Sequence, residues 1–124
     1  MTLIELMNAR TVLDSLAQEK VSAKLAYHLA KFISATNDDA EHYEKQRNEI
    51  ILKYALPEEE QKKYTDGQIH FKPEDAEPLA RELKELGDIE IEQPKTNPFT
   101  LDELNEVKLE PRQMFLLLPI IKED

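Results

Sequence analysis

The stretch SAKLAYHLAKFISATNDDAEHYEKQRNEIILKY, from Ser22 to Tyr54, contains neither glycine nor proline. Its apolar residues recur mostly at steps of three and four, the spacing of one helix face, although the middle of this stripe is polar. The apolar positions are Leu25, Ala26, Leu29, Phe32, Ile33, Ala40, Tyr43, Ile50, Ile51 and Tyr54. The pattern predicts a helix of about 33 residues, or roughly 50 Å. A chain of 124 residues cannot cover such a helix along its whole length, so part of it must face solvent or a partner.

The segment Asn37-Asp38-Asp39 is the weakest part of this predicted helix, because Asn and Asp are poor helix formers and good helix caps. We expect one continuous helix. The alternative is a break at this segment, with Asn37 or Asp38 capping a second helix.

A first helix is predicted from Thr2 to about Lys20. Thr2 and Glu5 have capping-box spacing, in which each side chain accepts a hydrogen bond from the other residue's backbone amide. Arg10 lies on this helix and is expected to be a surface charge. Ser22 is a good N-cap for the long helix, and the short joint before it favours an antiparallel hairpin. The first helix can pair with only about the first half of the second.

Pro57 ends the long helix, and an acidic connector follows it. Asp66-Gly67 is typical of a tight turn, since both residues adopt positive φ readily. A third helix is predicted within residues 73–87, closing at Gly87.

The last third of the chain combines short elements. Asp88–Glu92 alternates apolar and acidic residues, which predicts a strand with one buried face, and Val107–Leu109 is a candidate second strand pairing with it. Thr100 and Glu103 have the spacing of a second capping box. A last short helix follows Pro111, and we expect its apolar stretch to pack on the core.

Together these elements predict one domain, residues 1–124, of a mainly α class with a minor α+β component. Residues 1–56 form an N-terminal antiparallel helical hairpin with one long helix. Residues 57–124 form a small acidic C-terminal lobe with one or two short strands and short helices.

Charge is divided unevenly between these halves. Residues 1–56 carry seven Lys/Arg and eight Asp/Glu, whereas residues 57–124 carry nine and eighteen, for a total of −10. A chain this acidic lacks the basic footprint of a nucleic-acid-binding protein, so we expect no direct nucleic-acid binding. No segment approaches the ~20 apolar residues of a membrane span, and no signal peptide is evident. The absence of cysteine excludes disulfides and thiolate metal sites, and fits a cytoplasmic protein.

No catalytic, cofactor-binding or metal-binding residue is predicted, and the chain is not expected to be an enzyme. His28 and His42 lie 14 positions apart in the sequence, about 21 Å along one helix, so they cannot share a metal there. Asp38 and His42 have a spacing that can bind metal, but only one such pair is present. With two glycines in the chain, no phosphate-binding loop can form.

One cluster favours protein recognition: Tyr43, Arg47, Ile50 and Tyr54 share a face of the long helix beyond the reach of the first helix. Tyr and Arg are common anchors of protein interfaces. We expect the C-terminal elements to cover this face; the alternative is a self-association or partner surface formed by these four residues.

Two segments, VSAKLAYHLAK at residues 21–31 and YEKQRNEIILKY at residues 43–54, carry a family resemblance. With the Asp-Gly turn, the Glu/Leu-rich helix and the Ile-Glu-Ile-Glu stretch that follow, the chain resembles a group of small uncharacterised proteins of tailed bacteriophages and prophages of Gram-positive bacteria. The resemblance implies an accessory, assembly or host-interaction role in the cytoplasm of a bacterial host, and the group has no established active site whose residues could be carried over.

Two functions remain open. The first is a non-enzymatic accessory or assembly protein that binds itself, a phage protein or a host protein. If it binds itself, it forms a homodimer through residues 36–54. The alternative is an acidic inhibitor, a nucleic-acid mimic that occupies a host nucleic-acid-binding or defence enzyme.

Overall fold

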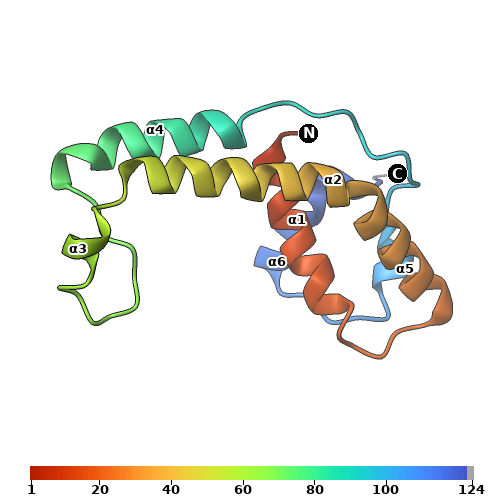
Figure 1. Cartoon of the computed structure of the whole chain (residues 1–124). Coiled ribbons are helices and arrows are strands. Elements are labelled where there is room, and N and C mark those ends of the chain that lie inside the picture. The colour runs from red at the N-terminus through yellow and green to blue at the C-terminus, as the bar shows by residue number, and fades with distance from the viewer. Residues whose placement is uncertain (123–124) are drawn as a thin grey trace.

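The computed structural model describes residues 1–122 and is mainly helical (Figure 1). Pairing between extended segments within these residues is limited to three isolated bridges, so the described chain contains no sheet. The helices are α1 (Leu3–Leu16), α2 (Ala23–Tyr54), α3 (Glu58–Gln61), α4 (Ala76–Gly87), α5 (Leu101–Leu104) and α6 (Pro111–Leu117), with 3-10 turns η1 (Pro73–Asp75) and η2 (Leu118–Ile120).

Helix α1 begins with the predicted capping box. The Thr2 hydroxyl accepts a hydrogen bond from the Glu5 amide at 3.2 Å, and the Glu5 carboxylate accepts one from the Thr2 amide at 2.9 Å. The helix ends at Leu16, before the expected end near Lys20. Residues 17–20 are all exposed and have no large apolar side chain to bury, so the chain turns there instead of continuing the helix.

Helix α2 runs unbroken from Ala23 to Tyr54, so the alternative of a break near Asn37 is wrong. Arg10 explains this continuity. Its Nη1 donates to the Ile33 carbonyl oxygen at 2.9 Å and to the Thr36 hydroxyl at 2.6 Å, and its Nη2 donates to the Asn37 side-chain oxygen at 2.9 Å. The expectation of a surface charge at Arg10 is therefore wrong: the guanidinium satisfies the polar middle of the α2 stripe.

Thr36 completes this polar contact. It is 1% exposed, and its hydroxyl donates to the Phe32 carbonyl oxygen at 2.9 Å while accepting from Arg10. Burying a hydroxyl group destabilises the fold unless the group is hydrogen-bonded. The Thr36 hydroxyl acts here as both donor and acceptor. The polar residues in the middle of the long helix thus join α2 to α1.

The main core lies where α1, the first half of α2 and the C-terminal segments meet (Figure 1). Its buried side chains are Leu6, Ala9, Val12, Leu13, Leu16, Leu25, Leu29, Phe32, Phe99, Leu104, Leu117 and Ile120. Leu117 and Ile120 of the apolar C-terminal stretch therefore pack on the core, as predicted, whereas Phe115 and Leu118 of the same stretch are exposed.

The segment after α4 pairs with the N-terminus of the chain. The Leu3 amide donates to the Ile89 carbonyl oxygen and the Ile91 amide donates to the Met1 carbonyl oxygen, both at 2.9 Å, with an antiparallel bridge between Thr2 and Glu90. The predicted strand Asp88–Glu92 is thus a single bridge with a different partner from the one expected. Val107–Leu109 does not pair with it, because the Val107 amide closes a turn onto Leu104.

Residues 41–87 form an arm that extends beyond α1 and α6 (Figure 1). It contains the second half of α2, helix α3, the loop that follows, η1 and α4, which packs along α2. At its base, Leu3, Tyr43 and Leu86 form a small buried cluster. Gly87 allows this approach, since a Cβ placed there would lie 3.1 Å from the Ile4 Cβ.

Candidate functional site

The four predicted interface residues lie on the arm, where α4 packs along α2. Tyr43 is buried with Leu86, and Ile50 packs against the same cluster. Tyr54 is half-buried, and Arg47 is exposed. The structure thus uses three of the four side chains inside the arm and leaves Arg47 at the surface.

An ion pair holds the outer part of α2 to α4. Lys53 Nζ lies 2.9 Å from a Glu82 carboxylate oxygen. The Tyr54 hydroxyl and the Lys53 ammonium together lower the pKa of the Glu82 carboxyl. The Glu82 carboxylate in turn raises the pKa of both Tyr54 and Lys53. Sequence reasoning missed this contact, because no local pattern relates two positions 29 apart in the chain.

The tip of the arm, residues 57–80, comprises α3, the loop that follows it, η1 and the start of α4. Its loop is fixed by the Gln61 side chain, which donates to the His70 carbonyl oxygen at 2.8 Å and accepts from the His70 amide at 2.9 Å. The Tyr64 ring stacks on the His70 ring, with 3.7 Å between their centroids. Gly67 has the positive φ, +72°, that the predicted Asp-Gly turn requires, although no strand ladder flanks it in residues 1–122.

Asp66 completes this network. Its carboxylate lies 2.9 Å from His70 Nε2 and accepts from the Gln68 amide at 3.0 Å. Both partners lower the pKa of the Asp66 carboxyl, and the hydrogen bond with His70 contributes most. The tip is therefore ordered by polar contacts and not by a buried core.

An apolar groove of about 400 Å³ lies between the tip loop and α4. It is lined by Ile69, His70, Phe71, Lys72, Pro73, Ala76, Leu79, Ala80 and Leu83. Ile69 is 51% exposed, and Tyr64 is also exposed nearby in the chain. Sequence reasoning did not find this groove, because it depends on the loop folding back onto α4.

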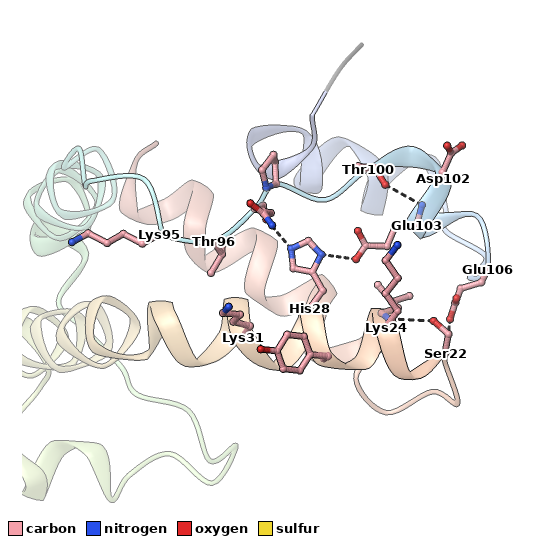
Figure 2. Close-up of a pocket in the computed structure, with 14 residues that line it drawn as sticks. Ser22, Lys24, His28, Lys31, Lys95, Thr96, Thr100, Asp102, Glu103 and Glu106 are labelled. Atoms are coloured by element: carbon pink, nitrogen blue, oxygen red, sulfur yellow. Dashed lines mark hydrogen bonds and ion pairs between the residues drawn. The ribbon is translucent and has the colours of Figure 1, made fainter.

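A larger cavity, about 910 Å³, lies between the first half of α2 and residues 95–106 (Figure 2). His28 bridges these two segments. Its Nδ1 lies 2.5 Å from a Glu103 carboxylate oxygen, and its Nε2 lies 2.7 Å from the Asn97 carbonyl oxygen. The imidazole also stacks on the Phe99 ring, with 4.0 Å between centroids.

Both ring nitrogens of His28 face oxygen atoms of the protein, at 2.5 Å and 2.7 Å, so the ring is engaged on both sides by contacts within the chain. The cavity lysines do not converge on one point, since Figure 2 shows Lys95 near the left edge of the view and Lys24 on the other side of His28, beside Glu103. We therefore interpret His28 as a structural brace between α2 and the C-terminal segment.

The brace alters the second predicted capping box. The Thr100 hydroxyl accepts from the Glu103 amide at 3.1 Å, but the Glu103 side chain contacts His28 instead of returning to Thr100. Glu106 adds a further link, because its carboxylate accepts from the Ser22 amide at the start of α2, at 2.6 Å.

The three histidines lie at separate places: His28 at the brace, His42 on the exposed side of α2 and His70 at the tip. Within residues 1–122, no three His, Asp or Glu side chains are grouped closely enough to hold a metal ion. In the same part of the chain, no helix combines the length and the apolarity that a bilayer crossing requires.

The sequence matches no protein-family model, and neither a curated protein nor a solved structure matches it.

Proposed function

We propose that this chain is a non-enzymatic accessory protein that acts by binding another protein through its arm. One observation carries the proposal: from residue 44 to residue 85, no side chain is fully buried. A long segment that orders without its own core usually gains burial elsewhere, and exposed apolar side chains mark such surfaces. Leu52, Tyr64 and Ile69 are exposed large apolar residues on this arm.

The setting that we propose is a tailed bacteriophage or prophage of a Gram-positive bacterium, in the cytoplasm of the host. This rests on the resemblance of residues 21–31 and 43–54, together with the elements that follow them. In this setting the arm binds a phage or host protein, in assembly or in host interaction.

The contacts of the predicted interface residues favour binding to another protein over formation of a homodimer. Tyr43, Ile50 and Tyr54 are occupied by contacts within the arm, which leaves Arg47 as the accessible member of that set. A homodimer through residues 36–54 would have to form on the opposite, mostly charged face of α2.

The charge of the tip favours a second candidate, the acidic inhibitor. Residues 57–80 carry seven Asp/Glu and three Lys, a net charge of −4 with His70 neutral. In this function the acidic side chains replace the phosphates of a nucleic acid on a basic host enzyme, and binding is electrostatic and strongly salt-dependent.

Affinity recovery of the tagged chain from phage-producing cells, at low and high salt with mass spectrometry, tests both functions. Ile69→Ser is the arm variant, and Ile89→Ser is its matched control, since the two isoleucines are 51% and 49% exposed. We expect a phage or host protein to be recovered at both salt concentrations with the Ile89→Ser variant and to be lost with Ile69→Ser.

Other outcomes discriminate clearly. A basic host protein that is recovered only at low salt and is displaced by added DNA supports the inhibitor and refutes the accessory function. Equal recovery with both variants refutes binding through the arm.

A further inference from the structure

We propose that the groove at the tip binds a basic segment of the partner protein, with an apolar side chain of that segment inserted between the tip loop and α4. This inference rests on the proposed function and adds the chemistry of the partner. Three observations carry it: the lining of the groove, its volume beside small residues, and the charge of the tip.

The lining supplies an apolar surface that is open to solvent. Ala76 and Ala80 are four residues apart, so they lie on one face of α4. Both are exposed, and Leu79 and Leu83 beside them are half-buried. Ile69 and Phe71 form the opposite wall. The small alanine side chains leave the space that a larger apolar side chain from a partner can fill.

The volume of about 400 Å³ lies within the range of binding pockets, roughly 300–1,000 Å³. Filling it removes the exposed parts of Ile69, Leu79 and Leu83 from water, which is favourable in proportion to the apolar area covered. The tip network of Gln61, His70 and Asp66 holds the loop wall in place before binding, so little ordering is required.

The charge around the groove selects a basic occupant. The tip carries a net charge of −4. Lys72 is the one Lys in the lining, but the Asp66 carboxylate lies 2.9 Å from His70 of the lining, and Glu74, Asp75 and Glu77 follow Pro73 of the lining in η1 and the first turn of α4. Lys or Arg side chains flanking the apolar anchor would complement this potential and raise the rate of association.

The same charge argues against a second copy of this chain as the occupant. A symmetric dimer places the same patch of each copy against the other. Two tips of −4 would then face one another, and like charges across an interface are unfavourable.

Short synthetic peptides test the inference directly. The probe carries one Leu flanked by Lys residues; one control replaces this Leu by Ser, and a second replaces the Lys residues by Glu. Binding is followed by NMR shifts of the Ala76, Ala80 and Leu83 amides. We expect the Leu/Lys peptide to shift these amides and both controls to bind at least about tenfold more weakly, which corresponds to about 1.4 kcal/mol.

Ala80→Gln fills the groove without changing the charge of the protein. Ala30→Gln, at another exposed alanine of a helix, is the matched control. We expect Ala80→Gln to weaken binding of the Leu/Lys peptide about tenfold and Ala30→Gln to leave it unchanged. Both variants should retain the circular dichroism spectrum of the parent.

Three results overturn the inference. The first is equal binding of the Leu and Ser peptides, which shows a purely electrostatic contact. The second is equal binding to the Ala80→Gln and Ala30→Gln proteins. The third is concentration-dependent dimerisation that Ala80→Gln abolishes, which assigns the groove to a second copy. If the groove binds no peptide while a partner is still recovered through Ile69, this inference fails and the proposed function stands.

Discussion

Arg10 is the contact that allows α2 to cross its own polar segment, and its removal is the most informative test of the fold. The Arg10→Met variant keeps much of the aliphatic volume but removes the guanidinium. Three hydrogen bonds are lost: those to the Ile33 carbonyl, the Thr36 hydroxyl and the Asn37 side chain.

The magnitude follows from the surroundings of each bond. A hydrogen bond from a charged donor contributes about 1.5–3 kcal/mol, and an exposed one contributes less. The Asn37 bond is exposed, whereas the bonds to Ile33 and Thr36 are partly buried. Thr36 keeps its bond to the Phe32 carbonyl, so its hydroxyl is not left without a partner. We expect Arg10→Met to lower the free energy of unfolding by about 2–3 kcal/mol.

Urea unfolding followed by circular dichroism measures this loss, and Arg47→Met is the control. Arg47 is exposed on α2, so its replacement should change the free energy of unfolding by less than about 0.5 kcal/mol. Amide hydrogen exchange at residues 33–39 should also accelerate in Arg10→Met. Equal stability of the two variants, with unchanged exchange in this segment, would refute the role assigned to Arg10.

Three further predictions concern the brace, the arm and its base. His28→Ala leaves the Glu103 carboxylate, whose side chain is 12% exposed, without its partner. We expect urea unfolding to show a free energy of unfolding lower by about 3 kcal/mol. His42 is exposed, so His42→Ala should lower the same quantity by less than about 0.5 kcal/mol. Tyr54 and Lys53 lower the pKa of the Glu82 carboxyl in the folded protein. The ionised Glu82 side chain therefore stabilises the arm fully at a pH above 4.5, its ordinary pKa. This stabilisation is lost as the pH falls through the lower pKa of the folded state. Lys53→Met should raise the pKa of Glu82, as measured by carboxyl-carbon NMR, and an unchanged titration would contradict the Lys53–Glu82 ion pair. Gly87→Val places a branched side chain against Ile4, and we expect thermal unfolding to show a destabilisation of about 1–3 kcal/mol; a neutral result would mean that α1 and α4 can separate at no cost.

Local signals in the sequence predicted the helices well. The Thr2–Glu5 capping box, the Ser22 cap and the absence of Gly and Pro from residues 22–54 act between near neighbours, and the structure has each of the elements that they predict. The turn at Gly67 and the helix end at Gly87 likewise depend on the residue itself.

Contacts between distant residues could not be predicted in the same way. His28 and Glu103 are 75 positions apart, and Glu103 also has a local role in capping, so the sequence indicated only the local one. The sequence predicted a strand at residues 88–92, but the structure has a single bridge there, at Glu90, and its partner is Thr2, which the sequence assigned only to a helix start. The tip groove requires the fold-back of residues 69–73 onto α4, which no periodic pattern encodes.

Site-specific photo-cross-linking tests the central claim, that the arm binds a partner protein through its tip. A photo-cross-linking amino acid is placed at position 69, on the tip, or at position 89, which is almost equally exposed but lies outside the arm. Irradiation of phage-producing cells, followed by mass spectrometry, is expected to give one defined protein adduct from position 69 and none from position 89. Adducts of the same protein from both positions, or from position 89 alone, would contradict the claim.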